Sequence, residues 1–501
     1  MEINLQKHFE KFRNNTIGHN ATFKTPYGEK QMLYADWIAS GRLYAPIEEK
    51  IKNLFGPMIG NTHSEASETG VSMTYAYRYA QRLIKKHVNA SADDVIITAG
   101  SGMTRVVNKL QRILGLKLPD TQSYFSYKTG INFDDCVDNL GNNKPVVFIT
   151  HIEHHSNHTS WLETIADVVV IPPASDLTVS PENLQKELEK YKDRKIKIGA
   201  FSAGSNVTGY IPPYYELCKI MHRYGGVCFV DFAASAPYID IDMHPADPLK
   251  KLDAIYFSPH KFLGGPGSAA VLVFDKKLYH NLVPDHPGGG TVKWTNPWNQ
   301  RSYIDDIEIR EDGGTPAFLQ TIRSALAIKL KEQMNTFYIK KREEQLLEKA
   351  FRELTKIPGL KILADNITDR LGVISFYIEG LHHNLIVKLL NDRYGIQVRG
   401  GCSCAGTYGH FLLNIDKNKS EKFTSEIDYG NLKNKPGWVR ISIHPTLSDE
   451  QLQFIIDAVR EIAINYEDWK QDYIQSAETG EWFHKTYRKD EGYIQNWFVL
   501  D

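Results

Sequence analysis

The stretch DAIYFSPHKFLGGPG, residues 253–267, places Lys261 directly after a histidine, between a short apolar run and a Gly-Gly-Pro-Gly turn. A lysine that only adds solubility rarely has such neighbours. We expect its ammonium group to lie in a confined site, where desolvation lowers the pKa and leaves the amine free as a nucleophile. One chemistry that uses such an amine is a Schiff base with pyridoxal 5'-phosphate (PLP), whose pyridine nitrogen also needs an acidic partner.

The residues on both sides of this stretch alternate between short β-branched runs and helix-period segments. Strands that alternate with helices predict an α/β fold whose mostly parallel sheet has helices on both faces. Ligands bind such sheets at the carboxyl ends of the strands, and the motifs described below follow strands directly. The predicted strands are residues 95–98, 145–150, 167–171, 196–201, 226–230 and 269–274.

The pattern changes at Pro316, where a long helical stretch begins that reaches about Lys356. A smaller α+β unit follows, with strands near residues 372–377 and 438–442. Its last helix begins at Ser448–Gln451, which has the spacing of a capping box.

We therefore predict a large domain of residues 25–315. Residues 1–24 and 316–501 would form a small domain with a C-terminal extension. Two polar segments, residues 120–143 and 414–435, are predicted to be surface loops or lids.

The bulk composition excludes several classes of protein. Among 501 residues, 59 basic and 60 acidic side chains give a net charge of -1, so a nucleic-acid role has no electrostatic support. Five cysteines do not make a disulfide framework. Residues 1–15 lack the apolar core of a signal peptide, and no apolar run approaches the roughly 18 residues of a membrane span. We expect a cytoplasmic protein.

Asp231 ends the predicted strand 226–230, thirty residues before Lys261, with one strand-helix unit between them. A carboxylate at the tip of a buried strand can pair with a protonated pyridine nitrogen, which keeps the ring an electron sink. The alternative is an aspartate that caps the next turn or helix. The spacing to Lys261 favours the functional interpretation.

Two further turns follow strands and suit an anionic cofactor. Gly100-Ser101-Gly102-Met103 opens a helix, whose free N–H groups bind phosphate, although a plain tight turn has the same residues. Asn206 could donate a hydrogen bond to a phenolate oxygen, or it could simply make an asparagine turn.

The segment His151-Ile-Glu153-His154-His155 also follows a strand. Its spacing fits no usual zinc motif, so we predict no metal site. A histidine ring that covers a flat cofactor is the sharper interpretation, and a capped loop is the alternative.

The segment Cys402-Ser-Cys404 lies in a glycine-flanked loop near an arginine. A nearby cation and exposed N–H groups would make a thiol nucleophilic, whereas the alternatives are an inert buried cysteine or half of a metal site. In the following strand, Arg440 can bind a substrate carboxylate bidentately or can belong to a surface ion pair.

Taken together, these motifs resemble the class V aminotransferase family and, within it, the cysteine desulfurases. Ser258-Pro-His260-Lys261 is similar to the family's Ser-Gly-His-Lys motif, and Asp231 matches its pyridine-nitrogen aspartate. The other matching segments are residues 100–104, 153–155, 205–206, 288–291, 313–316 and 395–405, with Arg440.

The resemblance implies a PLP-dependent transferase fold of the aspartate aminotransferase type, with PLP as cofactor. It implies that Lys261, Cys404 and His154 are catalytic and that Arg440 and Asn206 bind the substrate. Thr291 would reach the phosphate of a neighbouring subunit, so the active unit would be a homodimer. The implied cofactor-binding residues are Ser101, Gly102, Met103, His154, Asn206, Asp231, Ser258, His260, Lys261 and Thr291.

Several positions depart from the family pattern. Ala234 stands where the family has a glutamine, and Pro259 replaces a glycine. Cys402 stands where desulfurases carry histidine or serine, which resembles the desulfurase-like domain of molybdenum-cofactor sulfurases. The insertion after the cysteine loop and the tail beyond Tyr466 have no family counterpart.

The function that this resemblance implies is removal of sulfur from L-cysteine, or of selenium from selenocysteine. The products would be alanine and a persulfide on Cys404, with a sulfur-acceptor protein as partner. One alternative is a class V aminotransferase or C–S/β-lyase that acts on another amino acid. The other is a non-catalytic binding protein on the same fold.

Overall fold

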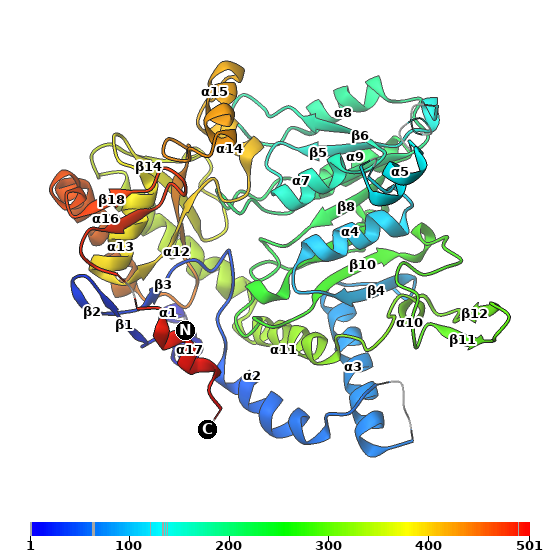
Figure 1. The fold of residues 1–501 in the computed structure, drawn as a ribbon. Coiled ribbons are helices and arrows are strands. Elements are labelled where there is room, and N and C mark those ends of the chain that lie inside the picture. The colour runs from blue at the N-terminus through cyan, green and yellow to red at the C-terminus, as the bar shows by residue number, and fades with distance from the viewer. Residues whose placement is uncertain are drawn as a thin grey trace.

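The computed structural model describes residues 3–62, 66–120, 122–132, 135, 137, 139–488 and 490–500. Its larger sheet has seven strands in the order β4-β10-β9-β8-β7-β5-β6 (Figure 1). β10 is antiparallel to both neighbours, and the other neighbouring pairs are parallel. The strands are β4 (Asp94–Ala99), β5 (Val146–Thr150), β6 (Asp167–Ile171), β7 (Lys197–Ser202), β8 (Val227–Asp231), β9 (Ala254–Phe257) and β10 (Ala270–Asp275). The predicted α/β fold is confirmed, and each of its six predicted strands lies within one residue of its place.

Helices cover both faces of this sheet because its strands carry apolar side chains on both sides. Phe148 and Ile149, which are adjacent on β5, belong to two different apolar clusters. The first cluster takes residues from α3 (Glu68–His87), α8 (Pro181–Lys190), α9 (Tyr214–Arg223) and α11 (Phe318–Met334). The second takes residues from α4 (Met103–Ile113) and α7 (His155–Leu162).

The smaller sheet is antiparallel and lies at the left in Figure 1. Its strands, in spatial order, are β13 (Leu360–Ile362), β14 (Val373–Ile378), β17 (Trp438–Ser442) and β16 (Arg399–Gly401). Apolar residues of α12 (Thr336–Leu354), α13 (His383–Tyr394) and α16 (Asp449–Lys470) pack against it. The capping box at the start of α16 is confirmed, with Ser448 and Gln451 bonded reciprocally.

The N-terminal segment joins this smaller unit. α1 (Leu5–Asn14) packs against α12, and β3 (Leu33–Tyr34) pairs in parallel with β15 (Ile396–Gln397). β3 lies inside the range predicted for the large domain, and the domain boundaries stay a prediction.

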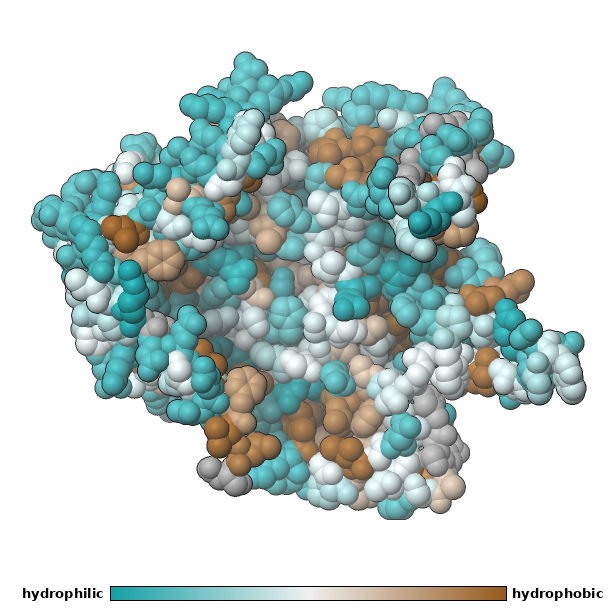
Figure 2. Space-filling view, viewed as in Figure 1, coloured by the Kyte–Doolittle hydropathy of each residue, from teal (hydrophilic) through white to brown (hydrophobic). Residues whose placement is uncertain are grey.

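Two expectations about the helices need correction. The long helical stretch is two helices, because Asn335 has φ 67 and its side chain accepts hydrogen bonds from the first N–H groups of α12. The segment 414–435 is not only a loop, since it contains α15 (Lys417–Asp428), a helix without buried residues. α15 projects at the top of Figure 1, and its surface is hydrophilic in Figure 2.

The segment 120–143 contains α5 (Tyr124–Thr129), and part of it lies outside the described residues. In the part of the chain that the structure describes, no helix is long and apolar enough to cross a membrane. Other elements are β1 (Thr22–Thr25), β2 (Gly28–Gln31), α2 (Ala45–Lys50), β11 (Val292–Thr295), β12 (Arg301–Tyr303), α10 (Ile307–Arg310), α14 (Gly406–Leu412), β18 (Tyr473–Gln475), β19 (Trp482–His484) and α17 (Gly492–Gln495).

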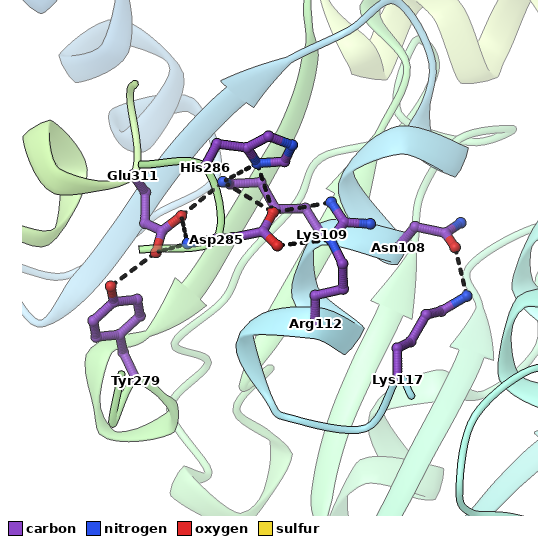
Figure 3. Close-up of polar contacts among 8 residues, drawn as sticks. All are labelled: Asn108, Lys109, Arg112, Lys117, Tyr279, Asp285, His286 and Glu311. Carbon is purple, nitrogen blue, oxygen red and sulfur yellow. Dashed lines mark hydrogen bonds and ion pairs between the residues drawn. The ribbon is translucent and has the colours of Figure 1, made fainter. Parts of the chain in front are cut away.

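A buried ion-pair network fastens α4 to the chain that follows β10 (Figure 3). The Nζ of Lys109 lies 2.7 Å from Glu311 and 3.4 Å from Asp285, and all three side chains are at most 6% exposed. Arg112 donates two hydrogen bonds to Asp285, and Tyr279 donates one to Glu311. Burial would raise the pKa of Asp285, but Arg112 and Lys109 lower it below its usual range.

Replacing Lys109 by methionine should therefore destabilise the protein strongly. The substitution leaves Glu311 and Asp285 buried without their shared cation, so we expect a loss of roughly 3–5 kcal/mol in the free energy of unfolding. Lys117→Met is the matched control, since Lys117 donates to Asn108 alone in Figure 3 and should cost about 1 kcal/mol. Urea unfolding of both variants measures the difference, and equal losses would contradict the role assigned to the network.

Candidate active site

A cavity of about 220 Å³ lies where the two sheets meet. The larger sheet contributes residues beyond the carboxyl ends of its strands, which is where ligands of such sheets bind. These residues are Gly102, Met103, Thr104, His154, Ser156, Ser202, Gly204, Asn206, Asp231, Ala233, Ala234, Ser258, His260 and Lys261. The N-terminal segment and the smaller sheet side contribute Ile38, Ala39, Arg399, Ser403, Cys404 and Arg440.

Lys261 and Asp231 both line this cavity, where Asp231 is buried and Lys261 is half-buried. Asp231 is the last residue of β8, and parallel pairing places it beside Tyr256 of β9, shortly before Lys261. Burial lowers the pKa of Lys261, and the charge of Asp231 opposes that effect. Burial likewise raises the pKa of Asp231, whose Oδ1 accepts a hydrogen bond of 2.7 Å from the N–H of Ala233. Each charge therefore offsets part of the desolvation of the other, and desolvation stays the larger effect on both pKa values.

The turn before α4 offers an anion site at the edge of the cavity. Gly100 has φ +60, which favours glycine, and Gly102 is the N-cap of α4. A Cβ added to Gly102 would meet nothing closer than the Ser258 hydroxyl at 4.0 Å, so there is open space above the turn. The first helical N–H, that of Met103, donates to the Ser258 hydroxyl at 2.9 Å. Helix dipole, free N–H groups and space together suit a phosphate.

The histidine-rich segment after β5 serves three separate purposes. His151 lies 3.1 Å from the carbonyl of Leu177, and the Nδ1 of His154 accepts from the N–H of Ser156 as the cap of α7. Burial and the charge of Lys261 lower the pKa of His154 to about 3, so its ring is neutral. Glu153 is buried and bonded to Thr150, Asn157 and Ser202.

The cysteine loop enters the cavity from the side of the smaller sheet. Cys404 is exposed and lines the cavity, whereas Cys402 is half-buried and is not among the lining residues. Cys218 and Cys228 form a disulfide, and Cys136 lies outside the described residues. Ser403 and Cys404 have φ of 52 and 56, a left-handed backbone that costs free energy outside glycine. Of the two thiols in this loop, Cys404 is therefore the one that lines the same cavity as Lys261.

Backbone hydrogen bonds hold the strained loop against the larger sheet. The Nδ2 of Asn206 donates to the carbonyl of Ser403 at 2.7 Å, and the N–H of His155 donates to the carbonyl of Cys404 at 2.8 Å. The N–H of Gly406 donates to the Nε2 of His155 at 2.9 Å. The side chain of His155 must therefore be unprotonated at Nε2. The amide of Asn206 has a structural partner here in addition to the role predicted for it.

Arg440 is buried in β17 and is held on two sides. One terminal nitrogen donates to the carbonyl of Asn206 at 3.2 Å, and the other donates to Asp36 at 2.7 Å. Asp36 also accepts from Arg399 at 3.2 Å, so one carboxylate bridges two guanidinium groups at the cavity. The Nε of Arg440 is buried and has no hydrogen-bond partner among the described residues. It is a donor that a bound carboxylate could satisfy.

Asp36 is a site residue that the sequence motifs did not reveal. It follows β3 in the segment Tyr34-Ala-Asp36-Trp-Ile, where a single acid between apolar residues is the only signal. Its partner Arg399 lies 363 residues further along the chain, and only the pairing of β3 with β15 brings the two together.

Two predicted residues lie elsewhere. Thr291 is fully buried, and its hydroxyl donates to the carbonyl of Gly288 at 2.6 Å, in the turn before β11. Neither Thr291 nor Ser101 is among the residues that line the cavity. His260 does line it, and burial lowers its pKa to about 4. The structure thus gathers the other predicted site residues and leaves these two outside.

Comparison with known proteins gives consistent results. A probable cysteine desulfurase from Halalkalibacterium halodurans is 28% identical over 379 residues, which is 75% of this chain and 84% of that protein. A probable cysteine desulfurase from Staphylococcus epidermidis is 27% identical over 381 residues, 75% of this chain and 84% of that protein.

Solved structures of two cysteine desulfurases share the fold. The apo enzyme from Thermococcus onnurineus has a TM-score of 0.70 at 19% identity, covering 93% of this chain and 99% of that one. CsdA from Escherichia coli has a TM-score of 0.69 at 21% identity, covering 93% of this chain and 100% of that one. The model of the aminotransferase class-V family matches residues 136–455. On that match, the chain belongs to the aminotransferase class-V family.

Proposed function

We propose that this chain is a PLP-dependent enzyme that removes sulfur from L-cysteine, or selenium from selenocysteine. Its products would be alanine and a persulfide on Cys404. The observation that carries the proposal is the exposed Cys404 thiol in the same cavity as Lys261 and Asp231. The names of the relatives, probable cysteine desulfurases, agree with it.

The cavity residues fit PLP in three respects. The open cradle at Gly102 suits its phosphate, and Asp231 offers a buried carboxylate for a protonated ring nitrogen. Lys261 is a half-buried amine whose lowered pKa suits a Schiff base. When bound, PLP would supply the electron sink for bond cleavage in the substrate.

The other side chains would bind the substrate and move protons. Arg440 would hold the substrate carboxylate through its unpartnered Nε–H, and Asn206 lies directly beside it. The amine of Lys261, whose pKa is lowered by burial, would move protons in the cavity, and the neutral ring of His154 would offer its Nε2–H there, because its Nδ1 already accepts from the N–H of Ser156. Asp36 would orient Arg440, because it fixes the opposite end of the guanidinium group.

Cys404 would carry out the sulfur transfer. Its thiolate forms an S–S bond with the sulfur of the substrate while the bond between that sulfur and Cβ breaks. The electron pair of the broken bond stays with the carbon skeleton, which takes up a proton and leaves as alanine. The fixed loop supports this role, because Asn206 and His155 bind the carbonyls of Ser403 and Cys404.

We further propose that the active unit is a homodimer and that a sulfur-acceptor protein takes the persulfide sulfur. Thr291 lies in a turn apart from the cavity of its own chain. A role for this turn at the phosphate of PLP would therefore require a second subunit.

Lys261→Ala should abolish the visible absorbance band of PLP held through a lysine. The substitution removes the only atom of this side chain that can form the Schiff base. Absorbance spectra after reconstitution with PLP measure the effect, and the exposed Lys277→Ala should keep the band. A protein that shows no band before substitution would contradict PLP binding and would favour a non-catalytic binding protein.

Cys404→Ser should abolish the release of alanine and sulfide from cysteine under reductant. Cys402→Ser, the matched control two residues away, should retain most of it because Cys402 does not line the cavity. Chromatography of the products separates alanine from pyruvate or another keto acid. Release of a keto acid, with full activity in Cys404→Ser, would favour the aminotransferase or C–S/β-lyase alternative.

A further inference from the structure

The C-terminal hairpin of β18 and β19 lies beyond the residues that the family model matches. It packs along α13, and the hydroxyl of the buried Tyr473 donates to Asp392 at 3.0 Å. Nearby, the guanidinium of Arg393 lies 4.0 Å from the ring of Tyr27 and 3.8 Å from that of Trp469. The hairpin is thus fastened firmly at one end of α13.

The hairpin also binds the end of the insertion that follows the cysteine loop. The N–H of Leu432 donates to the carbonyl of Ala477 at 2.7 Å, and the Nε2 of Gln475 donates to the carbonyl of Lys433 at 3.0 Å. The two segments without a family counterpart, the insertion and the tail, therefore contact each other directly.

His382, the N-cap of α13, connects this pair of segments to the smaller sheet. Its Nδ1 accepts from the N–H of Asn384 and from the Nε1 of Trp482, each at 3.2 Å. The Nε2 of the same ring lies 3.2 Å from the carbonyl of Lys433 and 3.1 Å from the Nε2 of Gln475. His382 thus joins β19, α13 and the insertion at one point.

α13 also contacts β16, the strand that precedes the cysteines. The Nδ2 of Asn384 donates to the carbonyl of Gly480 in the hairpin turn at 3.2 Å. A Cβ added to Gly400 would lie 2.6 Å from the Oδ1 of the same asparagine. A Cβ added to Gly437 would lie 2.8 Å from the Cα of Gly401. Gly400 and Gly401 lead directly into the cysteine loop, so Asn384 and Gly437 lie against the backbone from which the loop begins.

We propose that the C-terminal hairpin is a brace that positions the cysteine loop, with Trp482, His382 and Asn384 as positioning residues. It holds the loop from the side of the smaller sheet, while His155 and Asn206 hold it from the other side. The left-handed backbone at Ser403 and Cys404 needs such support on both sides. The benefit for sulfur transfer rests on the proposed function, but the mechanical coupling does not.

Trp482→Phe tests the brace with a minimal change. Phenylalanine keeps most of the ring and loses the Nε1–H that His382 accepts. We expect amide hydrogen exchange of residues 399–406 to become about fivefold faster, the factor that corresponds to one lost hydrogen bond. The matched control is Trp497→Phe, whose tryptophan is 71% exposed and which should leave the exchange unchanged. Exchange of β8 in the larger sheet should be unchanged in both variants, which separates the local effect from general destabilisation.

The kinetic arm measures alanine release from cysteine in the same two variants. Trp482→Phe should lower kcat about fivefold at unchanged KM and unchanged PLP absorbance, since the brace acts on the loop and not on the carboxylate or phosphate sites. Unchanged exchange of residues 399–406 in Trp482→Phe would overturn the brace, even if the unsubstituted protein releases alanine. Faster exchange in a protein that never releases alanine would keep the brace and overturn the proposed function.

Discussion

The enclosure of two charged groups, those of Lys261 and Asp231, in one cavity is the constraint on which the rest of the site depends. Neither charge would be stable alone in the interior, since each loses its hydration there. The parallel pairing of β8 with β9 solves this by bringing the carboxyl ends of both strands to the same edge of the sheet. The cavity, the helix start at Gly102 and the capping histidine at α7 all gather around that edge.

The smaller sheet and the loop beside it supply the other half of the site. Cys404 and Arg440 lie far along the chain from Lys261, yet backbone contacts place them in the same cavity. The loop conformation is costly in itself, and three hydrogen bonds to Asn206 and His155 offset that cost. The position of the thiol therefore depends on contacts with both sheets.

Much of this arrangement follows from local sequence patterns. β-branched runs placed six of the seven strands of the larger sheet within one residue and missed β9, and the motifs at strand ends pointed to Lys261, Asp231, His154 and Cys404, which line the cavity. The patterns did not predict elements that polar residues form without burying apolar side chains. α15 buries no side chain and so has no apolar periodicity, and the break at Asn335 depends on one capping amide within a continuous helical composition. Asp36 depends on contacts with residues hundreds of positions away, and the hairpin brace on contacts up to 100 positions apart, and no local pattern records those.

The bridge from Asp36 to two arginines has a consequence for selectivity. Asp36 is one acid shared by two guanidinium groups, so the corner formed by Arg440, Arg399 and Asp36 keeps a net positive charge. An anion is therefore still attracted to this corner of the cavity. The Nε–H of Arg440 has no partner within the described residues, and Asn206 and Asp36 each accept from one terminal nitrogen, so a carboxylate can bind only from the directions that these two leave open. The corner thus attracts anions by charge and selects among them by orientation.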